Sequence, residues 1–215
     1  MVYPPAVSDL PLRLPAAAAS TLAAALDQER KIDRALETLG PVADRDVVVV
    51  GGGPSELERL RSAGARTTAV DELPSAASGV LQDASADTIV SAWAGFRGVE
   101  PSVIAEVDRI LRPGGRLLVV HDYGRDDVSQ LHAAEGERPE YSLWSRRDGP
   151  FLANGFKVRV VHCWWTFDSV EAAQGFLEEA FAEAGGAVAA ALKRPRLSYN
   201  VAIYHRTLGT APGPG

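Results

Sequence analysis

Three consecutive glycines, Gly51, Gly52 and Gly53, follow a run of four valines and precede a helix-forming segment that starts at Pro54. A glycine turn between a buried strand and a helix lets a ligand approach the backbone, and the first amides of the helix face that ligand. Doubly wound sheets bind ligands at the carboxyl ends of their parallel strands. The three glycines are therefore candidate ligand-binding residues, although tight packing of a helix on a strand also uses glycine.

Asp71 ends the next predicted strand, residues 66–70. A carboxylate at this edge can accept hydrogen bonds from both hydroxyls of a ribose, so Asp71 indicates a nucleoside site beside the glycines. Ser91 and Trp93 end a further predicted strand, residues 88–93, and we assign them to the same ligand site. Trp93 would then line the pocket, whereas the alternative for an aromatic residue here is the hydrophobic core.

His121, Asp122 and Tyr123 follow the buried strand at residues 116–120. Such a trio could position a nucleophile or act as a general base, but a polar loop at a strand end explains it as well. We therefore assign no catalytic residue. The four histidines are scattered and no His/Cys pair has ligand spacing, so no metal site is predicted. The single cysteine, Cys163, lies in an apolar setting and is predicted to be buried.

Alternating helices and strands must position these residues, and this alternation predicts a parallel sheet with right-handed crossovers. The fold class is therefore α/β, a doubly wound and mostly parallel sheet with an N-terminal helix packed on it. The expected elements are a helix at 16–40, a strand at 46–50, a helix from 54, strands at 66–70 and 88–93, a helix from 101, a turn at 112–115 and a strand at 116–120.

The sequence of the C-terminal third predicts a pair of antiparallel strands at one edge of this sheet. A short helix is expected near residues 128–134, and a strand at 156–167. Asp168 and Glu171 resemble a capping box at the start of a helix that Gly185 and Gly186 end. A last strand follows at 199–205 and pairs with the strand at 156–167.

Four stretches of the chain carry a further signal: VVVVGGGPSELERLRSAGA, AVDELP, DASADTIVSAWAGF and IAEVDRILRPGGRLLVVHD. Together they make the segment from Asp46 to Asp122 resemble the class I S-adenosylmethionine (SAM)-dependent methyltransferases. The resemblance implies a methyltransferase-like Rossmann fold whose final antiparallel strand lies between two others. It also implies SAM as the cofactor, a small-molecule methyl acceptor, and cofactor contacts from Gly51, Gly52, Gly53, Asp71, Ser91 and Trp93.

The glycine loop departs from the family pattern in two places. Val49 stands where the family usually has an acid, and Ser55 where it has a third glycine. Glu56 is not expected to replace the acid directly, because it lies on the helix rather than on the strand. The segment between Asp71 and Asp87 is also too short for the usual helix and strand. Either this unit is truncated, or the ribose-binding segment is lost and Asp71 is not the ribose ligand.

Composition and the resemblance together predict that residues 1–215 form one domain. It comprises an extended arm (1–15), the N-terminal helix (16–40), a cofactor-binding half (45–123), a substrate-side and C-terminal half (124–208) and a disordered tail (209–215). The net charge of -6 argues against a nucleic-acid partner. The start does not read as a signal peptide, and no apolar run has the roughly 18 residues of a membrane helix, so we expect a cytoplasmic protein without a membrane partner.

Three functions are therefore considered. The first is methyl transfer from SAM to a small molecule. The second is a non-catalytic binding or scaffold protein that keeps the fold but has lost SAM binding, which Val49 and Ser55 favour. The third is a nicotinamide- or nucleotide-binding Rossmann protein, although the loop lacks the spaced glycines of that fingerprint. A homodimer is compatible with each of them.

Overall fold

The computed structural model describes Leu14 and residues 16–73, 81–93, 96, 99–134 and 141–209. Apart from Leu14 and Gly209, the predicted arm at 1–15 and the predicted disordered tail at 209–215 lie outside this part of the chain.

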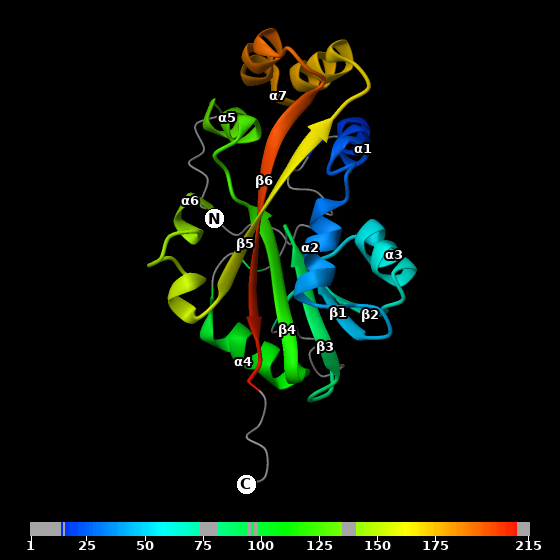
Figure 1. Ribbon diagram of the computed structural model, residues 1–215, viewed down its shortest axis with the longest axis vertical. Coiled ribbons are helices and arrows are strands. Elements are labelled where there is room, and N and C mark those ends of the chain that lie inside the picture. Colours follow the sequence, from blue (N-terminus) through cyan, green and yellow to red (C-terminus); the bar gives the residue numbers. More distant parts are fainter. Residues whose placement is uncertain are drawn as a thin grey trace.

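Six strands form one sheet in the order β2-β1-β3-β4-β6-β5, with helices on both faces (Figure 1). β1 to β4 run parallel, and β6 runs antiparallel to its neighbours β4 and β5. The predicted doubly wound sheet is therefore confirmed. The strands are β1 (Asp46–Val50), β2 (Arg66–Val70), β3 (Ala86–Ala92), β4 (Leu111–Asp122), β5 (Lys157–Thr166) and β6 (Arg196–Thr207).

β1 is a central strand, as its run of buried valines predicts. Val48 pairs with Thr68 of β2 on one side and with Ile89 of β3 on the other. β-Branched residues suit this position because both faces of a parallel sheet are covered. β2, by contrast, is the outer strand of the sheet and is largely exposed. In the described part of the chain no further strand follows β2 before β3, and residues 74–80 of this segment lie outside that part.

β6 lies between β4 and β5, as the resemblance implies. Ile203 pairs with Val120 of β4 and with Arg159 of β5, so the last strand of the chain is an inner strand. β4 is longer than predicted, since it begins at Leu111 and includes the expected turn at 112–115. These residues form an irregularity in the ladder, where the register with β3 shifts and Gly114 has a φ of 83°.

Seven α-helices and a short 3-10 helix, Leu152–Asn154, are present in the described ranges. Residues from α1, α2, α3, α5 and α7 share a hydrophobic core on one sheet face, and residues from α4 and α6 share another on the opposite face. Within the described residues, none of the helices combines the length and apolarity needed to span a bilayer. The helices are α1 (Ala16–Ala25), α2 (Lys31–Leu39), α3 (Pro54–Ser62), α4 (Pro101–Ile110), α5 (Asp127–Ala134), α6 (Tyr141–Trp144) and α7 (Val170–Ala191).

The prediction of one helix over residues 16–40 is wrong, because the chain breaks between α1 and α2. Leu26 leaves the helix to form an antiparallel bridge with Trp165 of β5. Asp27 then adopts a φ of 49°, and its carboxylate accepts hydrogen bonds from the backbone amides of Lys31 and Ile32 at 3.0 and 2.7 Å. Asp27 therefore satisfies the first amides of α2, which an unbroken helix would not have left open.

The predicted ends of the last helix are also wrong. Ser169, not Asp168, caps α7, because its hydroxyl accepts a hydrogen bond from the amide of Ala172 at 3.1 Å. The helix does not stop at Gly185; instead it kinks at Ala182, whose backbone is not helical. A β-carbon on Gly185 would lie 1.8 Å from the carbonyl oxygen of Leu177, so the glycine lets the two halves pack closely together.

Candidate functional site

The carboxyl ends of the four parallel strands bring the predicted site residues to one edge of the sheet. Gly51 follows β1, Asp71 follows β2 and Trp93 follows β3. Two backbone hydrogen bonds hold this edge together: the amide of Gly51 donates to the carbonyl of Val70 at 2.8 Å, and that of Trp93 donates to Val120 at 2.9 Å. The segments are therefore neighbours, as the strand order requires.

Gly51 and Gly52 are suited to the loop for different structural reasons. Gly51 has a φ of 67°, a left-handed conformation that glycine adopts without a steric cost. A β-carbon on Gly52 would lie 2.3 Å from Cγ1 of Val49 and 2.8 Å from Oε2 of Glu56. Gly53 is the N-cap of α3, in an extended conformation. The loop is thus a tight strand-to-helix turn with no room for a side chain at its centre.

Glu56 is a feature of this loop whose position could not be read from the sequence. Its side chain is 4% exposed, and its carboxylate lies over Gly52, next to the side chain of Val49. Arg59 approaches the same carboxylate at 3.6 Å and also binds Asp33 of α2 at 2.6 Å. A buried carboxylate in the first turn of a helix is favoured by the helix dipole. A helix residue therefore brings an acid to the side of the loop where the strand carries Val49.

Asp71 and Ser91 have contrasting surroundings. Asp71 is exposed directly after β2, so its carboxylate is accessible to a ligand from solvent. Ser91 has no exposed surface, and its position in β3 pairs with Val119 of β4. The two residues lie at the same end of the sheet, but only Asp71 presents its side chain at the surface in this structure.

Trp93 is held by a polar cluster at the ends of β3, β4 and β6. Its indole nitrogen donates to Oδ1 of Asp122 and lies 3.1 Å both from that atom and from the hydroxyl of Tyr199. The Tyr199 hydroxyl also donates to Asp122. Burial, together with the adjacent Asp122 carboxylate, raises the pKa of Tyr199 well above its ordinary value. Trp93 also has a φ of 52°, an uncommon backbone for a residue with a side chain.

The trio His121, Asp122 and Tyr123 does not form one group, because successive residues of a strand point to opposite faces of the sheet. The ring of His121 is buried and packs 4.5 Å from the ring of Trp144. Its Nε2 atom lies 2.5 Å from the carbonyl oxygen of Phe96. Asp122 joins Trp93 on the other side. The sequence reasoning missed Tyr199, which is nearly 80 residues further along the chain and becomes a partner only through the β4–β6 pairing.

Helices α1, α5 and α7 extend beyond the carboxyl ends of β3 and β4 (Figure 1). Two carboxylates attach the start of α5 to β6. Asp127 accepts hydrogen bonds from the amide and the hydroxyl of Ser198, both at 2.8 Å, and Asp126 accepts one from the amide of Asn200 at 2.7 Å. The loop that leaves β4 is therefore attached to β6, and α5 lies beyond the edge of the sheet that carries the candidate site residues (Figure 1).

Cys163 and the two tryptophans that follow it in β5 have structural roles. Cys163 is buried, as predicted, and burial raises the pKa of its thiol to about 12. Trp165 has no exposed surface, and the guanidinium of Arg196 lies 4.4 Å from the ring centre of Trp164. Among the described residues, no group of three or more His, Cys, Asp or Glu side chains could hold a metal ion.

Comparisons with known proteins agree with this architecture. No protein-family profile and no curated protein matches the chain. Among solved structures, a candidate type II methyltransferase from Anaeromyxobacter dehalogenans is similar, with a TM-score of 0.51 and 18% identity over 85% of this chain and 97% of that one. The YcgJ protein from Bacillus subtilis has a TM-score of 0.43 and 16% identity, over 86% of this chain and 100% of its own.

A third similar structure is geranyl diphosphate C-methyltransferase from Streptomyces coelicolor A3(2), solved with its substrate and S-adenosyl-L-homocysteine. It has a TM-score of 0.40 and 14% identity, over 83% of this chain and 78% of its own. At these identities the likeness concerns the fold. The chain therefore has the methyltransferase-like Rossmann fold that its sequence motifs predict.

Proposed function

We propose that this chain is a SAM-dependent methyltransferase-like protein that acts on a small-molecule acceptor. The observation that carries the proposal is the tight glycine turn between β1 and α3, with the exposed carboxylate of Asp71 at the end of the neighbouring strand. A doubly wound sheet binds its ligand at this edge. SAM has no phosphate, so the acidic first turn of α3 does not oppose it as it would oppose a dinucleotide.

The residues at this edge fit the two polar ends of the cofactor. Asp71 has the chemistry to accept hydrogen bonds from two ribose hydroxyls. Glu56, buried over Gly52, brings a carboxylate to the side of the loop where Val49 carries none. Such a carboxylate can organise the loop or attract a ligand ammonium group. We therefore assign the cofactor to Gly51–Gly53 and Asp71, with Trp93 and Ser91 at the end of β3.

When bound, SAM supplies a methyl group already activated by its sulfonium. The task of the protein is then to orient the acceptor and exclude water. Trp93, fixed through Asp122 and Tyr199, offers a rigid aromatic wall at the edge of the sheet. The start of α5, attached to β6, supports the segment that stands over it. Only some methyl acceptors require a general base, so the proposal does not depend on an assigned catalytic residue.

One observation favours the second function, a non-catalytic binding or scaffold protein. The Glu56 carboxylate is buried against the glycine loop and so lies where a ligand would approach the backbone. If the Glu56 carboxylate permanently occupies the space that the cofactor needs, the chain keeps the fold but does not bind the cofactor. A cytoplasmic location, a homodimer and a single-domain organisation accompany both functions as predictions.

Calorimetric titration with S-adenosylhomocysteine separates the two functions. We expect micromolar binding to the wild-type chain, abolished in Gly53→Val and weakened at least tenfold in Asp71→Asn. Glu72→Gln is the matched control, since Glu72 is the exposed acid next to Asp71 and should bind as the wild type does. Absence of heat up to millimolar ligand, from a sample that unfolds cooperatively, would overturn the enzyme function and leave the scaffold.

A further inference from the structure

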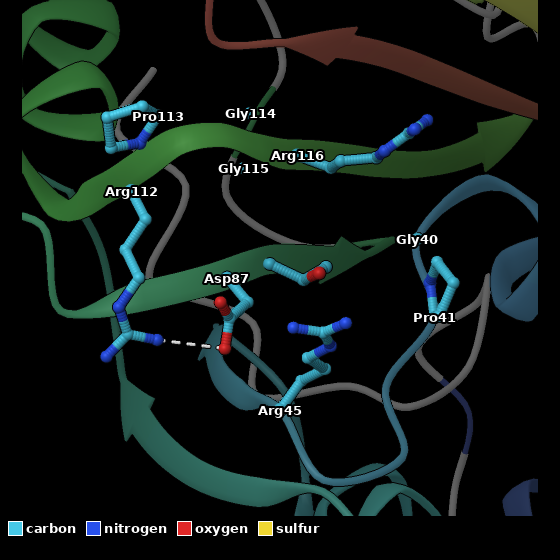
Figure 2. Close-up of a pocket in the computed structure, with 10 residues that line it drawn as sticks. Gly40, Pro41, Arg45, Asp87, Arg112, Pro113, Gly114, Gly115 and Arg116 are labelled. Carbon is cyan, nitrogen blue, oxygen red and sulfur yellow. Dashed lines mark hydrogen bonds and ion pairs between the residues drawn. The ribbon is translucent and has the colours of Figure 1, made fainter. Parts of the chain in front are cut away.

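A cavity of about 280 Å³ lies at the opposite edge of the sheet, at the amino ends of β3 and β4. The connection from α2 to β1 forms one wall through Gly40, Pro41 and Arg45, and the irregular start of β4 forms the other through Arg112 and Arg116 (Figure 2). Its position separates it from the glycine loop, which follows the carboxyl end of β1. The cavity therefore belongs to a different site.

The cavity contains more positive than negative charge. Asp87 is the only acid among its lining residues, and Oδ2 of this carboxylate accepts hydrogen bonds from Nη1 of Arg112 and from the amide of Asp46, both at 2.9 Å. Arg112 also binds Asp46 at 2.8 Å. The Asp87 charge is therefore already balanced within the protein.

Arg45 and Arg116 are different, because neither forms an ion pair with any residue in the described ranges. Both residues line the cavity: Figure 2 shows the Arg45 side chain pointing up between the two walls and the Arg116 side chain lying along β4, with Gly40 and Pro41 at one end and the Arg112–Asp87 pair at the other. Two arginines that form no ion pair with a described residue thus line one small cavity. The chain as a whole has a net charge of -6, so this grouping of positive charge is a local feature of the cavity.

The positive charge continues along the same face of the sheet. His205 of β6 pairs with Leu118 of β4 and with Lys157 of β5. Burial lowers the pKa of His205, and the nearby charges of Lys157, Arg116 and Arg159 lower it further. Three cations therefore lie close enough to this imidazole to act on it, and a group of like charges of this kind attracts anions.

We propose that this cavity binds a small dianion, and that a phosphate monoester is the class it fits best. Arginine presents planar, paired donors that match the oxygens of phosphate, and two arginines from opposite walls can hold two of its edges. The volume of about 280 Å³ is just below the range for ligand pockets, which begins at about 300 Å³, so the ligand is small. Thr88, which also lines the cavity, adds a hydroxyl to the polar lining.

The test is an NMR titration of the full chain with inorganic phosphate at pH 7.5 and constant ionic strength. We expect saturable shifts at the amides of Gly114 and Gly115 and at the side-chain Nε–H groups of Arg45 and Arg116. Binding should be at least tenfold weaker in the Arg45→Gln/Arg116→Gln double variant. Arg45→Gln alone serves as a milder substitution, because Arg45 is exposed and makes no ion pair with a described residue.

Two controls make the result decisive. Arg147→Gln removes an exposed arginine outside the cavity and should leave phosphate binding unchanged. Succinate tests whether a dicarboxylate replaces phosphate; tighter binding of succinate would overturn the phosphate assignment. Shifts that never saturate, that appear on all surface arginines, or that persist in the double variant would overturn the site itself.

Discussion

The indole nitrogen of Trp93 lies 3.1 Å from Oδ1 of Asp122; Trp93 directly follows β3, and Asp122 ends the adjacent parallel strand β4. Tyr199 of β6 joins them through its hydroxyl, which contacts both partners. A strand that runs in the opposite direction therefore completes the contact between the two strand ends. Because the cluster is partly buried, its hydrogen bonds stabilise one arrangement of the edge where the ligand is proposed to bind.

Ionisation of the Tyr199 hydroxyl should make the free energy of unfolding depend on pH in the alkaline range. Its pKa is raised in the folded chain, and that of Tyr204 is raised by burial, whereas both ionise near pH 10 when unfolded. The unfolded state therefore loses protons first, and stability falls as the pH rises above about 10. The expected slope is at most about 1.4 kcal/mol per pH unit for each tyrosine.

Urea unfolding at several pH values between 8.5 and 11 measures this slope. Tyr199→Phe removes one of the ionising groups and leaves Tyr204 and the buried thiol of Cys163, so the alkaline slope should become shallower. Stability at pH 8 should fall by about 1.5–3 kcal/mol from the lost hydrogen bond to a carboxylate. An unchanged slope in the variant would mean that Tyr199 ionises in the folded chain.

Gly52→Ala should destabilise the chain by about 1–3 kcal/mol, because the added methyl group would overlap Cγ1 of Val49 and approach the buried Glu56 carboxylate. Gly175→Ala is the matched control, since a β-carbon at this exposed helical position meets no atom within 4 Å. That substitution should stabilise the chain by up to about 1 kcal/mol. Thermal unfolding of both variants checks the pair, and equal effects would argue against the tight turn.

Ser169→Ala should cost about 1 kcal/mol, because it removes the hydroxyl that accepts a hydrogen bond from the amide of Ala172. Asp168→Ala should change stability by less than about 0.5 kcal/mol, as expected for an exposed residue next to the cap. Denaturant unfolding of the two variants decides which of the neighbours caps α7. A larger loss from Asp168→Ala would restore the capping box that the sequence indicates.

Acid unfolding should reveal the ion pairs at the start of β1. Hydrogen bonds from Arg66 and Arg112 lower the pKa of Asp46 to about 2 from its ordinary value of 3.8. Stability from these pairs is complete above the ordinary value and is lost as the pH falls toward 2. Asp46→Asn should therefore flatten the pH dependence between 4 and 2. The effect should stay below about 1 kcal/mol because the pairs are near the surface, and 1 M salt should reduce it further.

The sequence by itself determined the sheet and the edge of the sheet that carries the candidate site residues. A buried run of four valines, alternating helical segments and the glycine turn are local patterns, and each reports the burial and backbone conformation of its own residues. These patterns correctly predicted β1, β2, the start of α4 and the antiparallel strands. They also placed Gly51, Asp71 and Trp93 at the same end of the parallel strands.

Only the tertiary structure decided which side chains meet. The break after α1 depends on a bridge between Leu26 and Trp165, and the kink of α7 depends on close contact between its two halves at Gly185. Tyr199 reaches Asp122 because β6 inserts beside β4, and the Glu56 carboxylate is buried against Gly52 at the start of α3. Arg45 and Arg116 line one cavity because the connection from α2 to β1 lies beside the start of β4. Except for those of Gly185 and Glu56, these contacts join residues far apart in the chain, and local periodicity carries no information about them.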